Sequence, residues 1–248
     1  MQTSLSIVIP CFNEVENIPK MKDELLPVLV KLAEEYSVQV VFVDDGSSDG
    51  TLNAFKDAFS SDSLPNIDFT YLQHAVNMGL GAAMRTGLKA SRGGLIITTD
   101  SDGTYHFSSM IGMLKYLENA DIVTASPYHP DGNVVGVPEY RLVLSRGSSM
   151  IYRLLVQWDI HTYTCLFRAY RREVIDTISF ESHGFLAVTE LLVKSRLKGF
   201  RVVEFPAVLY RRVFGVSKVK LVRTILDHLN FQGRILLYRL GVKSAISF

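Results

Sequence analysis

Apolar strand-like segments alternate with helical segments through the first hundred residues of this 248-residue chain. The run Val38–Val43 is apolar except for Gln39 and rich in β-branched valine, which is typical of a strand covered on both faces. We expect strands at Ser6–Pro10, Val38–Val43, Asp68–Gln73 and Leu95–Thr99, with helices between them at Asn17–Leu32, Thr51–Phe59 and Ala82–Ala90. This alternation predicts an α/β fold with a mostly parallel central sheet and helices on both faces. Pro27 is expected to kink or divide the first helix.

From about Pro130 onward the alternation loosens. Helices are expected at Leu142–Val156 and Leu186–Leu197, and a strand at Arg201–Pro206. A further amphipathic helix is expected at Leu221–Leu240. No internal repeat, linker or low-complexity segment divides the sequence, so we expect one domain with a specialised second half.

Bulk properties exclude several classes of protein. A formal net charge of +1 gives no global case for nucleic-acid binding. The two cysteines are too few for a disulfide framework, so a reducing compartment is the expectation. We expect no signal peptide, because Met1 leads directly into a strand pattern, and no window of about 18 residues is free of charge, as a spanning helix would require.

Two acids follow the fourth expected strand, at Asp100 and Asp102. On a continuing strand they would point to opposite faces, but at a strand end, where the backbone turns, both can reach one hard cation. Mg²⁺ is usually held by one or two carboxylates together with phosphate oxygens of a substrate. The pair therefore indicates a metal–diphosphate site, and solvated loop acids are the alternative.

A second acidic turn, Asp44–Thr51, ends one strand and opens a helix. Aspartate, serine and glycine suit turns and helix caps, so a purely structural role stays open. An EF-hand is excluded because Lys56 stands where the bidentate glutamate would be. A carboxylate at Asp45 could instead accept hydrogen bonds from a ribose or a base.

Small residues open the helix after Asn77, but the third glycine of a dinucleotide fingerprint is absent, so NAD binding is not expected. Glu190 lies among apolar neighbours on an expected helix and could orient an acceptor. The loop from Arg212 to Lys218 is basic and contains glycine, so it could fold over a diphosphate or be a plain surface loop. Arg141 and Ser145 fall one helical turn apart and could form a second anion site.

In order along the chain, these segments resemble the family 2 glycosyltransferases of GT-A fold, and among them the dolichyl- or polyprenyl-phosphate mannosyl- and glucosyltransferases. The matching segments are Ile7–Glu14, Val43–Thr51, Asn77–Ala82, Asp100–Asp102, Tyr140–Arg141, Leu144–Gly147, Phe167–Arg172 and Gly215–Lys218. The resemblance implies one GT-A domain over residues 1–220, with a nucleotide-binding half at about 1–103 and an acceptor half at about 104–220. Residues 221–248 would follow as a C-terminal amphipathic helix.

The resemblance also implies roles for individual residues. The donor nucleotide would contact a group of strand-end residues: Pro10, Phe12, Glu14, Val43, Asp45, Asp100 and Ser101. Asp100 and Asp102 would hold Mg²⁺ or Mn²⁺, with Thr104 as a third ligand. Arg141 and Ser145 would receive the lipid phosphate. The catalytic group would be Asp102, with Arg212 and Lys218 closing over the donor. Glu190 is the one candidate base, which transfer to a saccharide or other hydroxyl would need.

The activity implied is inverting transfer of a hexose, with GDP-mannose as the expected donor, to dolichyl or polyprenyl phosphate. A phosphate monoester is largely a dianion at neutral pH and needs no general base. Pro127, Val188 and the segment 160–166 depart from the family pattern, and all lie in the acceptor half. Two alternatives therefore stay open: a saccharide or other hydroxyl acceptor, and a non-catalytic nucleotide-sugar-binding regulatory subunit.

The expected location is the cytoplasmic face of a membrane, with peripheral attachment. The last forty residues are rich in arginine and lysine between apolar residues, which is typical of a helix in the membrane interface. A plain surface helix and a helix that docks a partner stay open, and a small membrane-anchoring partner is one such candidate.

Overall fold

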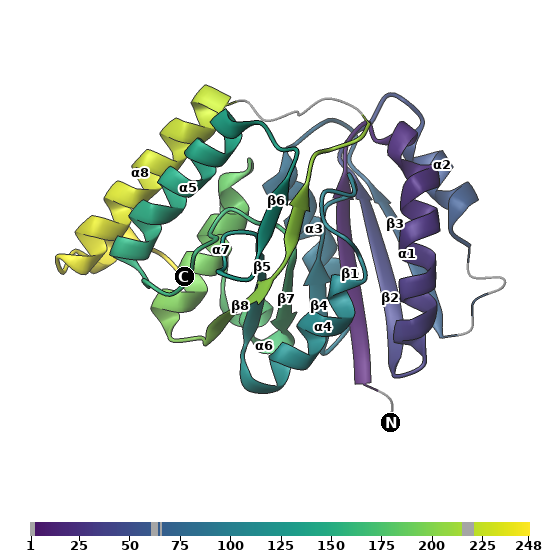
Figure 1. The fold of residues 1–248 in the computed structure, drawn as a ribbon, viewed down its shortest axis with the longest axis horizontal. Helices are drawn as coiled ribbons and strands as arrows, with labels where there is room; N and C mark the ends of the chain where they lie inside the picture. The colour runs from purple at the N-terminus through teal and green to yellow at the C-terminus, as the bar shows by residue number, and fades with distance from the viewer. Residues whose placement is uncertain (1–2, 61–63, 65, 215–220) are drawn as a thin grey trace.

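A seven-stranded sheet forms the centre of the computed structural model, which describes residues 3–60, 64, 66–214 and 221–248 (Figure 1). The strands lie in the order β3 (Ile67–Gln73), β2 (Tyr36–Asp44), β1 (Thr3–Cys11), β4 (Leu95–Thr98), β7 (Arg168–Arg171), β5 (Ile122–Ser126) and β8 (Val202–Pro206). Neighbouring strands are parallel, except that β7 runs antiparallel to both β4 and β5. The predicted mostly parallel sheet is confirmed.

The two faces of the sheet carry separate hydrophobic cores because successive side chains of a strand point to opposite faces. In β2, for example, Phe42 packs in one core and Val41 in the other. The first core is covered by α1 (Ile18–Ala33), α2 (Thr51–Ala58) and α4 (Ser109–Tyr116), and the second by α3 (Leu80–Ala90), α6 (Arg172–Thr177) and α7 (Leu186–Lys198). Helices therefore lie on both faces, as expected.

Helix α1 continues through Pro27 and is not divided there. Short 3₁₀ turns occupy Val15–Asn17, Leu117–Asn119 and Lys243–Ala245. The remaining strands, β6 (Asn133–Val135) and β9 (Val208–Tyr210), form a separate parallel pair. This pair brings the end of β9, and with it Arg212, back toward the carboxyl ends of the central strands.

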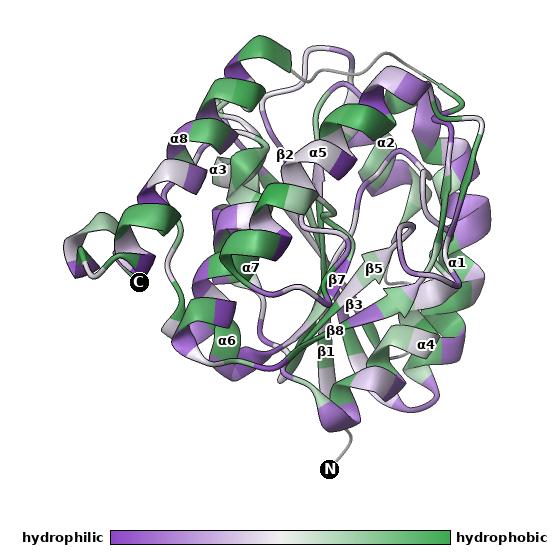
Figure 2. Ribbon diagram, turned by 60° about the vertical axis from the view of Figure 1, so that its left-hand side comes forward, coloured by the Kyte–Doolittle hydropathy of each residue, from purple (hydrophilic) through white to green (hydrophobic). Residues whose placement is uncertain are grey.

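Two helices, α5 (Glu139–Leu155) and α8 (Leu221–Arg239), lie side by side at one edge of the molecule (Figures 1 and 2). Phe231 and Ile235 of α8 and Tyr152 of α5 pack into the second core. Large apolar side chains nevertheless remain exposed along both helices: Val143, Leu144, Met150, Ile151, Leu154, Val222, Leu226, Leu229, Leu236 and Leu237. Among the described residues, no helix is both long and apolar enough to cross a bilayer.

Candidate functional site at the carboxyl ends of the strands

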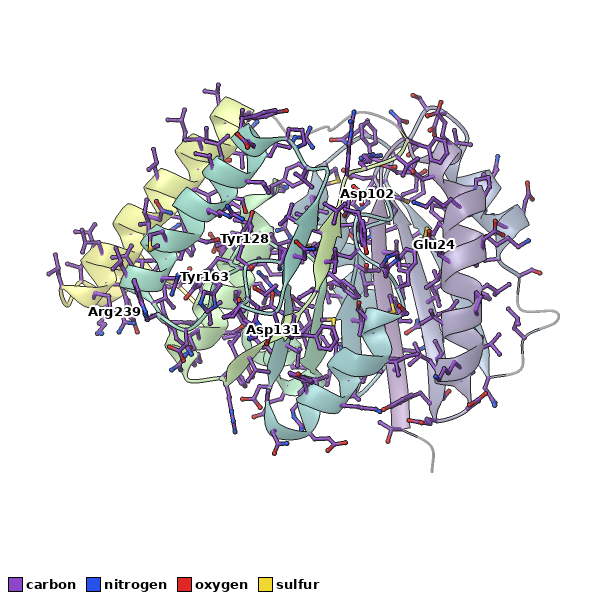
Figure 3. The ribbon with its side chains drawn as sticks, in the orientation of Figure 1. Glu24, Asp102, Tyr128, Asp131, Tyr163 and Arg239 are labelled. Atoms are coloured by element: carbon purple, nitrogen blue, oxygen red, sulfur yellow. The ribbon has the colours of Figure 1, made fainter. Side chains whose placement is uncertain are left out.

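Strands β1, β2 and β4 are mutually parallel and end at one edge of the sheet, so the residues after them meet there. Figure 3 places Asp102 at this edge. A cavity of about 930 Å³ opens beside it. Its lining includes nine of the residues predicted from sequence: Pro10, Phe12, Glu14, Asp45, Asp100, Ser101, Asp102, Arg141 and Arg212.

Asp100 and Asp102 both line this cavity. Burial, followed by the neighbouring charge of Asp102, raises the pKa of Asp100 above its usual range. The Asp102 carboxylate is oriented by the backbone N–H of Thr104, which donates to Oδ1 over 3.1 Å. Two acids that repel each other in a cavity, with hard oxygen donors, fit a divalent cation such as Mg²⁺ or Mn²⁺. In the described part of the chain no cluster of three or more acidic, histidine or cysteine side chains could hold a metal.

Arg212 brings positive charge to the same place. Its guanidinium forms an ion pair with Glu14 and lies 3.7 Å from Asp102 Oδ2. Glu14 also accepts a hydrogen bond of 2.5 Å from the side-chain amide of Asn17. The turn after β1 and the segment after β9 are thus connected across the cavity.

Asp45 is nearly buried, and both of its carboxylate oxygens have protein partners. The backbone N–H groups of Met78 and Gly79 donate to it over 2.9 and 2.7 Å, and its Oδ1 lies 2.7 Å from Nδ1 of His74. The other ring nitrogen of His74 lies 2.9 Å from the hydroxyl of Thr86 on α3. Asp45 therefore holds the turn that forms one wall of the cavity. Sequence reasoning gave His74 no role, although its place directly after the strand next to β2 is the signal that could have found it.

A second cavity of about 610 Å³ runs between α5 and α8. Most of its lining is apolar, including Val143, Leu144, Ile151, Leu221, Ile225 and Leu229. Arg141, Phe185 and Thr224 line both cavities, so the two meet at Arg141. Ser145 lines the second cavity and lies 2.8 Å from the hydroxyl of Thr164. The structure thus brings the predicted pair Arg141 and Ser145 to the junction between a polar cavity and an apolar one.

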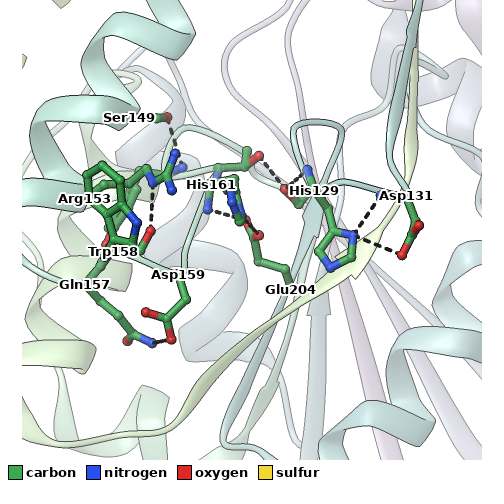
Figure 4. A network of polar contacts seen from close by, with 12 residues as sticks. His129, Asp131, Ser149, Arg153, Gln157, Trp158, Asp159, His161 and Glu204 are labelled. Atoms are coloured by element: carbon green, nitrogen blue, oxygen red, sulfur yellow. Dashed lines mark hydrogen bonds and ion pairs between the residues drawn. The ribbon is translucent and has the colours of Figure 1, made fainter.

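The loop that carries Thr164 is anchored by Glu204 of β8 (Figure 4). The carboxylate of Glu204 accepts hydrogen bonds of 2.8 Å from the backbone N–H groups of His161 and Thr162, and it lies 2.7 Å from the His161 ring. The hydroxyl of Thr162 is 2.7 Å from that of Ser126 at the end of β5. The sheet therefore fixes this loop beneath α5, in the segment that departs from the family pattern.

Three predicted site residues lie elsewhere. Val43 is fully buried in the core, where it approaches Gly87 of α3. Thr104 orients Asp102 through its backbone and does not line the cavity. Glu190 also lies outside the cavity lining, in a buried ion pair with Lys194. Lys218 falls outside the described residues.

Comparison with known proteins agrees with this architecture. The fold is that of the GT-A glycosyltransferases: glucosyl-3-phosphoglycerate synthase from Mycobacterium tuberculosis, solved with Mn²⁺ and UDP, superposes with a TM-score of 0.69 at 17% identity, over 96% of this chain and 80% of that one. A mannosyltransferase from Pyrobaculum calidifontis, in complex with GDP-Man and Mn²⁺, gives 0.65 at 19% identity, over 96% of this chain and 65% of that one. The family model for glycosyl transferase family 2 matches residues 6–179, and the chain belongs to that family. The predicted family and fold are confirmed.

Two curated relatives match most of the chain. The polyprenol monophosphomannose synthase of Mycolicibacterium smegmatis is 33% identical over 221 residues, which cover 86% of this chain and 80% of that protein. The dolichol-phosphate mannosyltransferase of Pyrococcus furiosus is 27% identical over 247 residues, which cover 98% of this chain and 67% of that protein.

Proposed function

We propose that this glycosyltransferase moves mannose from GDP-mannose to a polyprenyl-type phosphate, with inversion at the anomeric carbon. One observation carries the proposal: the polar cavity with its acid pair meets an apolar cavity at Arg141. A long-chain lipid phosphate has the same division, with an anionic head and an apolar chain. The two curated relatives are named for mannose transfer to such lipids.

The donor half of the reaction would use the acid pair and Arg212. Asp100 and Asp102 would hold Mg²⁺ or Mn²⁺, and the cation would supply electrostatic stabilisation of the donor diphosphate. Arg212, already placed between Glu14 and Asp102, would turn toward the diphosphate as negative charge develops on it. Pro10, Phe12 and the turn held by Asp45 would enclose the nucleoside.

The acceptor half would use the junction between the cavities. Arg141 would pair with the lipid phosphate, and the hydroxyl of Ser145 would donate a further hydrogen bond. The isoprenoid chain would lie in the apolar cavity between α5 and α8. In this arrangement the head of the lipid faces the donor and its chain leads away toward the edge of the molecule.

The chemical step follows from these positions. A phosphate oxygen of the acceptor attacks the anomeric carbon and forms the new C–O bond. The bond from that carbon to the diphosphate oxygen breaks, and its electron pair leaves with GDP. Because the attacking phosphate is already an anion at neutral pH, no protein side chain has to accept a proton.

The exposed apolar residues of α5 and α8 support attachment to a membrane surface. They lie together at one edge of the molecule, coloured green in Figure 2, and α8 also carries Arg223, Arg234 and Arg239. Apolar side chains beside basic ones suit the interface of an anionic leaflet. We place this attachment at the cytoplasmic face, where a small membrane-anchoring partner could share it.

The test is release of nucleotide from GDP-, UDP- and dTDP-sugars with Mg²⁺ or Mn²⁺, each with and without polyprenyl phosphate. We expect release from GDP-mannose that requires both the lipid phosphate and the metal. Release that requires a saccharide acceptor instead would replace the lipid assignment. Donor binding with no release in the presence of any acceptor would support the regulatory alternative.

A further inference from the structure

A buried ion pair lies behind one wall of the donor cavity. Glu190 and Lys194 are one turn apart on α7, and Nζ of Lys194 lies 2.7 Å from Oε1 of Glu190. Their side chains are only 4% and 0% exposed. A charged side chain that is buried so completely needs close partners of opposite charge and hydrogen bonds to remain charged. The structure supplies both for this pair.

The partners of Glu190 beyond Lys194 are backbone groups of one segment. The N–H of Ser182 donates to Oε2 over 2.9 Å, and the N–H of Glu181 lies 3.2 and 3.3 Å from the two oxygens. Lys194 in turn donates to the carbonyl of Ser179 over 3.1 Å. The ion pair therefore holds residues 179–182 from the side of the core.

The same segment is held from the opposite side by α3. Arg85 donates to the carbonyl of Ser182 over 2.8 Å, and the N–H of Gly81 donates to that of His183 over 2.7 Å. A Cβ at Gly81 would lie 2.0 Å from the carbonyl oxygen of Ser182, and one at Gly79 would lie 2.5 Å from that of His183. Only glycine permits this approach.

This contact has a consequence for the cavity, because Ser182, His183 and Gly184 line it from one side and Met78 and Gly79 adjoin them. Asp45 holds Met78 and Gly79 through their N–H groups. A continuous set of contacts thus runs from Glu190 through the segment 181–183 to the turn that Asp45 fixes.

We propose that Glu190 and Lys194 are a positioning pair, which sets the segment 181–184 against Gly79 and Gly81 and so shapes the donor cavity. Glu190 would then accept no proton during the reaction. The proposal rests on the proposed function only in that the site transfers a sugar. It is supported by the state of the carboxyl group: burial raises the pKa of Glu190, but hydrogen bonds from Lys194 and Ser182 outweigh this and leave it below its usual range. A charged carboxylate with these partners is a weak base.

Three variants separate a positioning pair from a general base: Glu190→Gln, Lys194→Met and the two combined. For a positioning pair, each single change leaves one buried charge without its partner. We expect KM for the donor to rise about tenfold in each, the size of a typical coupling between residues in contact. The double variant removes both charges, and glutamine can still accept from the N–H of Ser182. We expect the donor KM of the double variant to return to within about threefold of the wild-type value. A difference of that size is comparable to the deviation from additivity that is usual between independent substitutions.

A general base gives a different result. Both variants with glutamine at position 190 would lose about 10²–10⁴-fold in kcat, the double one no less than the single, and the acidic limb of the pH–rate profile would disappear. That outcome would overturn the proposal. Glu181→Gln is the matched control, because it removes a carboxylate from the same segment and leaves the buried pair intact. Its kinetics should equal those of the wild type, and a tenfold rise in its donor KM would also count against the pair.

Two further measurements keep the test decisive. GDP binding to each variant, measured by calorimetry without any acceptor, should follow the same order as the donor KM. If the wild type transfers no sugar to lipid phosphate, the proposed function fails, and the binding series still tests the pair. If the double variant does not fold, Arg85→Met loosens the same segment from the other side. It should raise KM for the donor with an unchanged pH profile, and an unchanged KM would contradict the proposal.

Discussion

Arg212 forms an ion pair with Glu14, although 198 positions separate them in the sequence. The same guanidinium lies 3.7 Å from Asp102. One side chain therefore connects the turns after β1 and β4 to the segment that follows β9. The guanidinium of Arg212 therefore supplies positive charge at the place proposed for the donor diphosphate. Glu14 and Asp102 hold it there.

Replacing Arg212 by alanine should lower kcat more than it raises KM for the donor. The guanidinium would stabilise charge that develops as the diphosphate leaves, and losing one such donor costs about 10²–10³-fold in kcat. Steady-state kinetics with GDP-mannose measures the change. Arg211→Ala is the control, since Arg211 is exposed and does not line the cavity. Equal effects of the two changes would show that general positive charge, not the position of Arg212, matters.

Replacing Asp102 by asparagine should abolish the metal dependence of donor binding. The amide keeps the shape of the side chain but carries no negative charge, so it is a weaker ligand for a hard cation than the carboxylate. Calorimetry of GDP binding with and without Mn²⁺ should show strengthening by the metal in the wild type only. Asp131→Asn is a suitable control because Asp131 is a highly exposed acid outside the cavity lining. Strengthening by Mn²⁺ that persists in Asp102→Asn would refute the metal assignment.

The apolar cavity can be filled without touching the polar one. Gly147 of α5 lines it, and a Cβ there would meet no atom of the described residues within 4 Å. Gly147→Leu should raise KM for long-chain polyprenyl phosphate about tenfold, because the leucine side chain would occupy space that the isoprenoid chain needs. The isoprenoid chain would then bury less apolar surface and bind more weakly. KM for a short-chain acceptor should not change. Gly233→Leu on α8, also with open space at its Cβ but outside this cavity, is the matched control. Equal KM values for long acceptors in both variants would contradict the placement of the isoprenoid chain in this cavity.

Acidic substitutions on the exposed face of α8 should weaken membrane attachment. Leu226 and Leu237 are 60% and 48% exposed. Leu226→Glu combined with Leu237→Glu should reduce cosedimentation with anionic vesicles and leave donor binding unchanged, because charge beside an anionic surface is repelled. Val30→Glu places the same charge on an exposed apolar site of α1, away from this face, and should bind vesicles as the wild type does. Unchanged sedimentation of the α8 variant would place the membrane contact elsewhere.

His228 should make the packing of α8 against α5 sensitive to acid. Burial lowers its pKa to about 4, and its Nδ1 lies 2.9 Å from the hydroxyl of Tyr152. Between about pH 6.5 and 4 the unfolded chain binds a proton that the folded protein does not, so stability falls as the pH is lowered through this window. The loss is about 3 kcal/mol at most. Urea unfolding at several pH values measures it, and the slope over this window should be shallower in His228→Gln. An equal slope in that variant would assign the acid sensitivity to other groups.

The first half of the fold could be predicted because local patterns determine it. The strand at Val38–Val43 is apolar except for Gln39 and lies within β2, and the acid that follows β2, Asp45, lines the cavity. Seven of the nine predicted residues that line the cavity lie at or after the ends of β1, β2 and β4, since parallel strands end together. The other two, Arg141 and Arg212, come from α5 and from the segment after β9.

The second half was harder because its elements depend on distant partners. Strand β7 is short and begins and ends with arginine, so its sequence gives little sign of a central strand. Arg168 is fully buried there only because Thr124 and the carbonyls of Tyr163 and Val188 accept its hydrogen bonds. Helix α4 and strands β5, β6 and β9 were missed as well. Beyond Lys194, the partners of Glu190 are backbone groups, which no sequence pattern identifies.

The position of β7 between β4 and β5 bears on how the chain reaches its native state. While a ribosome extends the protein, β1 to β4 can pair early, but the outer edge of β4 has no neighbour until residues 168–171 emerge. Unpaired edges are templates for association with other chains. Nascent molecules would therefore be most prone to aggregate during synthesis of the stretch between Thr98 and Arg168, and a fragment that stops in that stretch keeps the open edge permanently.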